Sequence, residues 1–207
     1  MKKLILIIFF LIGIVKINAQ SDHLEPVDGI LNSYDFEFEY HTKIREILFD
    51  GLTDTPNIRF LTLPSFSPTY VLDIDKDNET KKYYLIYHKC KTSIWYNDNW
   101  RKIKVDKYKS ELTNKSAELM IKLFKTAINQ TKYYENELLG FDGTDYYFSV
   151  FDKGIKTGTV WSPNKKTRMG KLVEIGNHLI ELVKQEKFKV DFNENLTSRI
   201  ENLITEF

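Results

Sequence analysis

Residues 141–184 constrain the fold of this chain most, because they combine a β-hairpin, a proline-bounded loop and a long amphipathic helix. Aromatic and β-branched residues fill 145–151, and Asp152-Lys153-Gly154 fits a three-residue hairpin loop with glycine in the left-handed position. The return strand is expected over 155–161, and Pro163 ends it because proline cannot donate to a strand ladder.

Two glycines in this unit indicate close packing. The hairpin register sets Phe148 opposite Gly158, where the aromatic ring can cover the bare glycine backbone. Thr167 is the expected N-cap of the following helix, and Gly176 lies in the middle of its apolar stripe. Because a glycine inside a helix costs about 1 kcal/mol relative to alanine, we expect the helix to approach the sheet closely there.

The apolar patterns elsewhere predict an α+β fold in which an antiparallel sheet of hairpins packs against three or four amphipathic helices. Alternating aromatic and acidic residues predict a half-buried strand over 34–40, and a helix is expected over 42–52. Further strands are expected over 58–63, 69–75 and 83–96, a short strand or extended link over 188–192, and further helices over 114–130 and 194–207.

The first 20 residues have the pattern of a signal peptide. Two lysines precede an apolar run over 4–15, and Asn18-Ala19-Gln20 forms a polar end with a small residue. The run is shorter than the roughly 20 residues that a membrane span needs. We expect cleavage after Ala19 or Gln20, which leaves 21–207 as a single α+β domain without a transmembrane span. An uncleaved N-terminal anchor is the alternative.

Charge and cysteine content limit the partners and the sources of stability. Without the first 20 residues, 27 basic residues face 29 acidic ones, so the net charge is −2. This near-neutral charge, without basic clustering, argues against nucleic acid as a partner. With Cys90 as the single cysteine, no internal disulfide can form. We expect a buried thiol, and a reactive thiol or an intermolecular link are the alternatives.

A pair of tryptophans marks the surface that the sequence favours for binding. A two-residue turn at Asn97-Asp98 would pair Trp95 with Trp100. One face of this hairpin would form core, and exposed aromatic rings rimmed by polar groups on the other face often mark a binding site. Alternatively, a helix covers this second face while the lysine side chains extend outward. The predicted core face carries Tyr84, Ile86, Cys90, Ile94, Ile103 and Val105. The predicted outer face carries Tyr83, Leu85 and Lys104 together with the candidate binding residues Tyr87, Lys89, Lys91, Trp95, Trp100 and Lys102.

Residue patterns typical of metal sites and catalysis are missing. His88 and Cys90 could supply two metal ligands, but zinc sites need three or four protein ligands, so a satisfied core histidine is favoured. The acidic run over 73–79 resembles the start of a calcium loop, but Asn78 and Tyr84 stand where glycine and glutamate are needed. A solvated hairpin turn is expected there. We find no nucleophile elbow and no phosphate-binding glycine loop, and assign no catalytic residue, metal site or cofactor.

Three short motifs carry a resemblance. In Asn18-Ala19-Gln20, the Asp142-Gly143-Thr144 turn and the Trp161-Ser162-Pro163 step, the chain resembles uncharacterised exported single-domain proteins of the Bacteroidota. The resemblance covers mainly residues 1–20 and 140–184. It implies export and no particular activity.

These observations favour an exported, non-catalytic binding protein of the periplasm or extracellular space, with a protein or glycan partner at the Trp95 and Trp100 face. A small exported hydrolase with a dispersed site is one alternative, and it would need His41 or His88 beside a hydroxyl or carboxylate. A structural component of an envelope assembly is another, and it would expose apolar surface on the last helix. The sequence leaves the oligomeric state open.

Overall fold

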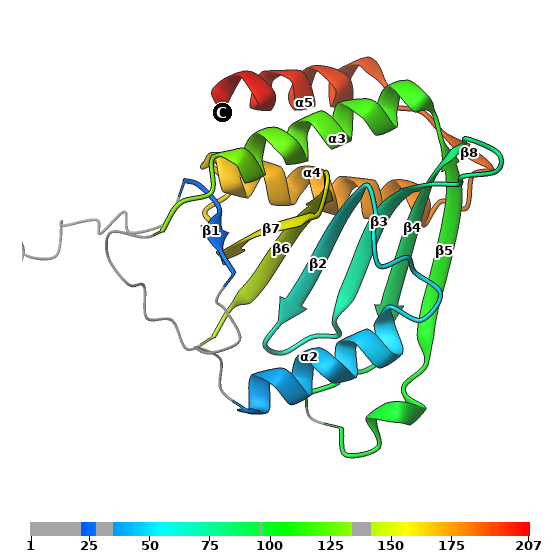
Figure 1. The fold of residues 1–207 in the computed structure, drawn as a ribbon, viewed down its shortest axis with the longest axis vertical. Coiled ribbons are helices and arrows are strands. Elements are labelled where there is room, and N and C mark those ends of the chain that lie inside the picture. The colour runs from blue at the N-terminus through cyan, green and yellow to red at the C-terminus, as the bar shows by residue number, and fades with distance from the viewer. Residues whose placement is uncertain (1–21, 28–34, 96, 134–141) are drawn as a thin grey trace, which may run out of the picture.

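The computed structural model describes residues 22–27, 35–95, 97–133 and 142–207, so the expected signal peptide lies outside the described residues. It confirms the α+β class: an eight-stranded sheet carries helices on both faces (Figure 1). The strand order is β1-β7-β6-β2-β3-β4-β5-β8, and the pairing is antiparallel except between β5 and β8. The strands are β1 (Glu25–Pro26), β2 (Ile58–Pro64), β3 (Tyr70–Lys76), β4 (Tyr83–Cys90), β5 (Val105–Leu112), β6 (Thr144–Phe151), β7 (Ile155–Trp161) and β8 (Lys189–Val190).

Three helices begin where capping side chains satisfy their first free amides. The side chains of Thr113, Thr167 and Asn193 each accept a hydrogen bond from a backbone N–H three residues later. Thr167 is therefore the N-cap that the sequence predicted. In the described part of the chain, no helix has the length and apolar character to cross a membrane. The helices are α2 (Asp35–Leu48), α3 (Asn114–Asn129), α4 (Arg168–Val183), α5 (Glu194–Glu206) and the short 3₁₀ helix η2 (Trp100–Lys102).

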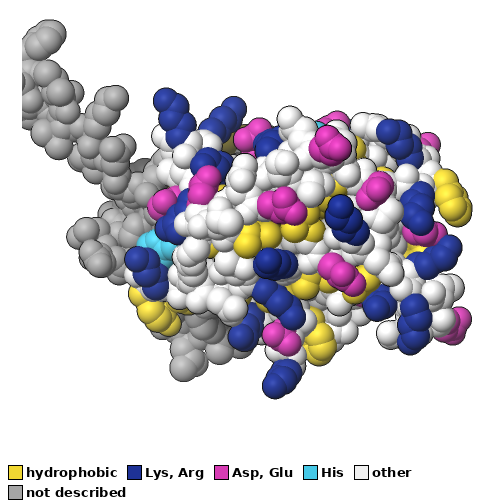
Figure 2. All heavy atoms as spheres, turned by 90° about the horizontal axis from the view of Figure 1, so that it is seen from above, with side chains coloured by type: hydrophobic (Ala, Val, Ile, Leu, Met, Phe, Trp, Pro, Cys, Tyr) yellow, Lys and Arg dark blue, Asp and Glu magenta, His cyan; other side chains and the backbone are white. Residues whose placement is uncertain are grey.

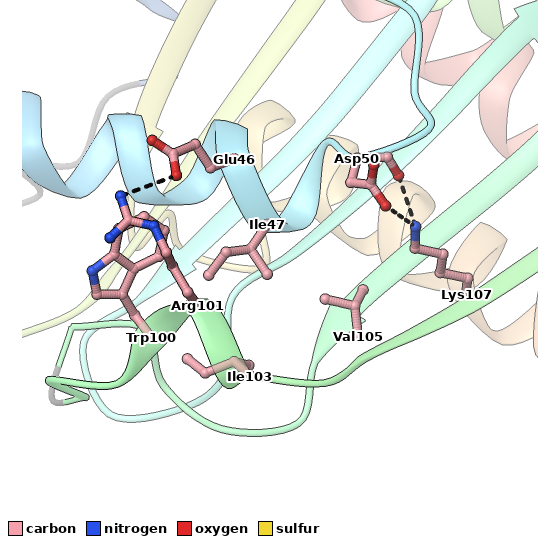
Figure 3. A pocket seen from close by; sticks show the side chains of 8 residues that line it. All are labelled: Glu46, Ile47, Asp50, Trp100, Arg101, Ile103, Val105 and Lys107. Carbon is pink, nitrogen blue, oxygen red and sulfur yellow. Dashed lines mark hydrogen bonds and ion pairs between the residues drawn. The ribbon is translucent and has the colours of Figure 1, made fainter.

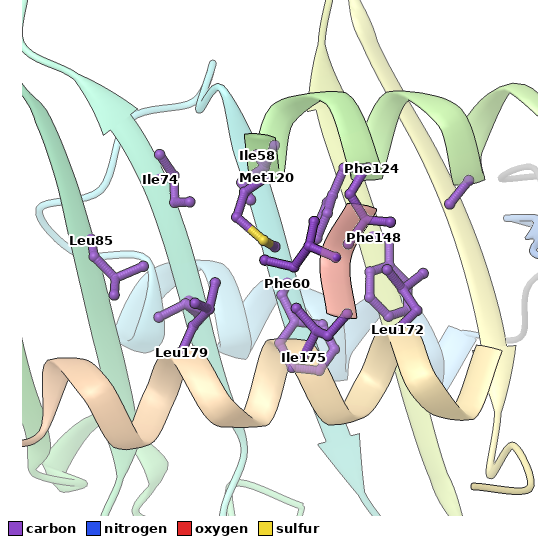
Figure 4. Close-up of a cluster of buried hydrophobic side chains, with 14 of the residues drawn as sticks. Ile58, Phe60, Ile74, Leu85, Met120, Phe124, Phe148, Leu172, Ile175 and Leu179 are labelled. Carbon is purple, nitrogen blue, oxygen red and sulfur yellow. The ribbon is translucent and has the colours of Figure 1, made fainter. Parts of the chain in front are cut away.

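The main core lies between the sheet and a layer formed by α3, α4 and α5 (Figures 1 and 4). Phe148 lies opposite Gly158, as the hairpin register predicted, and its ring centre is 5.0 Å from that of Phe60. A Cβ atom on Gly176 would lie 2.6 Å from the Phe60 ring. The close approach predicted for this helix is confirmed, and it explains the glycine. On the outer side of the helix layer, basic and acidic side chains alternate around small apolar areas (Figure 2).

Helix α2 covers the opposite face of the sheet, and it overturns one prediction. The strand predicted over 34–40 is wrong, because α2 begins at Asp35 and continues without a break to Leu48. Its inner side packs Tyr40, Ile44 and Leu48 against the sheet in a second cluster. Tertiary packing of this four-residue spacing outweighs the local two-residue alternation of aromatic and acidic residues.

The connection between β4 and β5 also differs from the prediction. The register is the predicted one, with Cys90 opposite Val105. The ladder ends close to this pair, however, and the described residues 91–95 and 97–104 form no strand and include η2. The prediction of a two-residue bend at positions 97 and 98 is therefore wrong.

The assignment of the two faces of β4 needs a correction as well. Tyr83, Leu85 and Tyr87 belong to the main core, although they were predicted to face outward. Cys90 and Ile94 are buried as predicted, but in the second cluster against α2. Because helices cover both sides of β4, apolar residues occur on both of its faces, and the alternation does not identify the main core.

Candidate functional site

The two tryptophans both lie on the α2 side of the sheet. The Trp95 indole is 47% exposed and meets the Tyr40 ring edge-on, with ring centres 4.7 Å apart. The Trp100 indole is half-buried, and Lys43 Nζ lies 5.9 Å from its ring centre. Since Tyr40 and Lys43 are neighbours on α2, both indoles contact this helix. The two tryptophans therefore do not face each other across a pair of strands, as the sequence had predicted.

The other predicted binding residues do not share one surface with the indoles. Tyr87 is only 4% exposed and packs against neighbouring tyrosines under the helix layer, so it cannot contact a partner. Lys89 follows on that same side of β4 and is exposed. Lys91 pairs with Asp106 at 3.1 Å, and Lys102 is exposed on η2. The structure therefore separates Tyr87 and Lys89 from the tryptophan corner.

An open groove of about 430 Å³ lies beside Trp100, between α2, η2 and the start of β5 (Figure 3). Ile47, Ile103 and Val105 form its apolar part, between charged residues at its two ends. We call this the α2–β5 groove. Its lining residues are Glu46, Ile47, Asp50, Trp100, Arg101, Ile103, Val105 and Lys107.

Ion pairs fix both ends of the α2–β5 groove. At one end Arg101 lies 3.4 Å from the Glu46 carboxylate, and its guanidinium carbon is 4.1 Å from the Trp100 ring centre. At the other end Lys107 Nζ donates at 2.8 Å to both the backbone oxygen and the carboxylate of Asp50. This ammonium group holds the pKa of Asp50 below its usual value.

Sequence reasoning found Trp100 but missed most of the α2–β5 groove. Glu46, Ile47 and Asp50 come from α2 and the residues just after it, 50 or more positions before η2. Only Ile47 belonged to a recognised pattern, the apolar side of the predicted helix. Nothing in the spacing of these residues indicates that α2 crosses the sheet next to β5.

A second group of polar residues surrounds the first half of α2. The His41 ring lies 6.3 Å from the Tyr147 ring, and burial lowers the pKa of His41 while the Glu37 charge opposes that shift. Burial and the Glu37 carboxylate raise the pKa of Asp145 to about 6. This group brings an imidazole and two carboxylates to one region of the structure.

The remaining candidates for chemistry have structural roles. His88 is buried, and its Nδ1 lies 2.8 Å from the backbone oxygen of Leu48, so it is the core histidine that the sequence favoured. Cys90 is a buried free thiol, and burial raises its pKa to about 11. The Asp77 carboxylate accepts hydrogen bonds from the backbone N–H groups of Glu79 and Thr80, which forms the expected turn.

Among the residues that the structure describes, no group of three or more His, Cys, Asp or Glu side chains could hold a metal ion. Comparisons with protein families, with curated proteins and with solved structures find no match to this chain. The α2–β5 groove must therefore be interpreted from its own chemistry.

Proposed function

We propose that this chain is an exported, non-catalytic binding protein of the periplasm or extracellular space, and that the α2–β5 groove takes up a protein partner. The observation that carries the proposal is an apolar floor between two ion pairs, beside a tryptophan on which an arginine is stacked. Tryptophan and arginine dominate the binding energy of many protein interfaces, where they surround a small apolar centre.

The arrangement around Trp100 favours a protein over a glycan. Sugar rings stack on an uncovered aromatic face, but Arg101 lies 4.1 Å from the Trp100 ring centre, and Lys43 is also close to this ring. The two ion pairs leave the apolar centre bordered by both signs of charge. A protein surface supplies apolar and charged groups together, so it complements this pattern better than a neutral sugar does.

Export rests on the N-terminal sequence. The charged start, the short apolar run and the Asn18-Ala19-Gln20 end support removal of the first 20 residues during secretion. The free thiol of Cys90 is buried, so it is shielded from oxidation outside the cell.

Trp100→Ala tests the groove directly, and Tyr133→Ala is the matched control because Tyr133 is 78% exposed and follows α3 instead of lining the groove. Proteins captured from an envelope extract are purified, and their affinity for each variant is measured. We expect Trp100→Ala to lower the affinity for the specific partner by about 30-fold or more, as removal of a central hot-spot residue from an interface does. Tyr133→Ala should bind like the unaltered chain. Equal affinities for both variants would refute the groove, and binding on a glycan array that Trp100→Ala abolishes would replace the protein partner by a sugar.

A small exported hydrolase is the second candidate, and the group around Asp145 supports it. General acid catalysis needs a carboxyl whose pKa is raised towards neutral pH, and burial together with the Glu37 charge, which also acts on His41, raises the pKa of Asp145 to about 6. The test is hydrolysis of chromogenic esters, glycosides and peptides between pH 5 and pH 8. Turnover by the unaltered chain that Asp145→Asn removes would support this candidate. The alternative of an envelope assembly part has no such support, because Leu196, Ile200 and Leu203 of α5 are buried.

A further inference from the structure

The outer edge of β5 lacks a strand partner over most of its length. β8 pairs only with Glu111 and Leu112, and 105–109 have no strand on their outer side in the part of the chain that is described. Figure 1 shows β5 at the border of the sheet, with β8 near one end of it. An unpaired edge of this kind can take up a further strand.

The backbone of this edge is oriented for pairing. Glu111 N donates to Phe188 O and Thr113 N donates to Val190 O, both at 3.1 Å, so the odd-numbered amides of β5 point away from β4. Alternate residues in an antiparallel ladder direct their N–H and C=O groups to the same side. The amides of Val105, Lys107 and Lys109 therefore face outward, while those of Asp106 and Tyr108 face β4.

Positive charge is concentrated around this edge, although the charge of the whole chain is close to zero. Residues 89–109 contain seven Lys or Arg and two Asp, a net charge of +5 in a chain whose total is +1, so the expectation that basic residues do not cluster is wrong for this stretch. Lysines also protect edge strands from uncontrolled pairing. Among the described lysines of this stretch, Lys102 and Lys104 are exposed and form no ion pair, so their ammonium groups can meet carboxylates of a partner. Lys109 also forms no ion pair, and its Nζ lies 4.1 Å from the centre of the Tyr84 ring.

The α2–β5 groove lies beside the same edge of β5. This position favours an edge that binds a partner strand over an edge that lysines merely protect from pairing. Val105 and Lys107 belong to both the edge and the groove lining. A strand added to β5 would place alternate side chains on the α2 side, where Val105, Lys107 and Lys109 also point. An apolar side chain next to Val105 would enter the groove, and a carboxylate four residues away would lie next to Lys109.

We propose that the β5 edge and the α2–β5 groove together bind an extended acidic segment of a partner protein as an added strand. The proposal rests on the protein-binding function and specifies how that partner docks. A second copy of this chain is a poorer occupant, because antiparallel pairing of two β5 edges would bring their lysines against each other.

The experiment uses a pool of nine-residue peptides in which one apolar residue and one Glu stand four positions apart, in either order, among Ser and Thr. Binding to the full chain is measured by fluorescence anisotropy at low and high salt, and amide exchange is followed by NMR. We expect the peptides to bind, with an affinity that falls at least tenfold at high salt or when Glu is replaced by Gln in the peptide. Amide exchange should slow at Val105, Lys107 and Lys109. The amides of Asp106 and Tyr108, already directed at β4, should change little.

Two variants separate backbone pairing from charge. Lys109→Ala removes the ammonium group and keeps the outward N–H, whereas Lys109→Pro removes both without touching an amide that β4 uses. We expect Lys109→Pro to weaken binding at least tenfold more than Lys109→Ala does.

Equal affinities of these two variants, or peptide binding that leaves the three amides unchanged, would overturn the added strand. So would a pool that fails to bind at millimolar concentration. If Trp100→Ala still weakens binding of the captured partner by about 30-fold or more in any of these cases, the groove function stands and only the strand proposal falls. Slow exchange of the three amides that depends on protein concentration, without peptide, would replace the peptide by a second copy.

Discussion

The Arg59 guanidinium forms a bidentate ion pair with the Asp73 carboxylate of the neighbouring strand, with Nε 2.8 Å from Oδ1 and Nη2 2.6 Å from Oδ2. Both side chains are buried on the α2 side of the sheet. Nη2 also donates at 2.8 Å to the backbone oxygen of Thr53, and the guanidinium lies over the Phe49 ring. The pair therefore holds the segment between α2 and β2 against the sheet.

Arg59→Met should destabilise the fold by about 3–5 kcal/mol, because it leaves the Asp73 carboxylate buried without a partner. Urea unfolding followed by circular dichroism measures this change. The double variant Arg59→Met/Asp73→Leu removes both charges and should recover at least half of the loss. A double variant less stable than Arg59→Met alone would contradict this account of the buried charge.

Gly176→Ala should destabilise the chain by about 1–2 kcal/mol, although alanine is the better helix former. The added methyl group would lie 2.6 Å from the Phe60 ring, so the helix or the ring must move. Thermal unfolding of Gly176→Ala, Phe60→Leu and the combined variant measures the coupling. In the Phe60→Leu background the alanine should be neutral or stabilising. A uniform gain in both backgrounds would mean that the close approach does not restrict this position.

The parts of the fold that the sequence predicted are those whose signals are local. The hairpin of β6 and β7 follows from alternating residues around a loop that ends in Gly154, and α4 follows from the Thr167 cap and its stripe. The β4–β5 register was predicted correctly from a bend that does not exist. That agreement shows that register and turn are separable, since the ladder is set by residues well away from the connection.

The candidate site could be predicted only in part, because it depends on where α2 lies. Trp100 was identified from its chemistry, but Glu46 and Asp50 read as ordinary polar residues on a helix. The apolar side of α2 could cover any exposed strand pair, and no local signal selects β5. Tyr87 was misplaced for the related reason that both sides of its strand are buried.

Residues 22–27 should be essential for the stability of the fold, because this segment packs into the main core. Leu24 is fully buried, β1 pairs with β7, and the Asp22 carboxylate accepts hydrogen bonds from Arg168 at the start of α4. A chain that begins at residue 21 should be as stable as the full chain. For a chain that begins at residue 28, the free energy of unfolding should fall by at least as much as in Leu24→Ala. We expect Leu24→Ala to cost about 2–5 kcal/mol. Equal denaturant midpoints for the two truncated chains would show that this segment is dispensable.

Asp145 should make the fold less stable as pH rises from 4 to 7. Burial and the Glu37 charge raise the pKa of its carboxyl from 3.8 to about 6 in the folded chain, so the folded state holds the proton more tightly than the unfolded state does. The resulting stabilisation is complete below pH 4 and is lost as pH passes through 6. By linkage the loss approaches about 3 kcal/mol. Asp145→Asn cannot ionise, so its stability relative to the unaltered chain should rise over this range in urea unfolding.

Asp77→Asn is the control for this pH dependence because its shift has the opposite sign. Hydrogen bonds from the Thr80 and Glu79 amides lower the pKa of the Asp77 carboxyl. Its charge therefore stabilises the fold above pH 4, and that contribution fades as pH falls through the lowered pKa. Relative to the unaltered chain, the stability of Asp77→Asn should be lowest at neutral pH, where the relative stability of Asp145→Asn is highest. Parallel pH profiles for the unaltered chain and Asp145→Asn would mean that the Asp145 carboxyl is not shielded from water in the folded state.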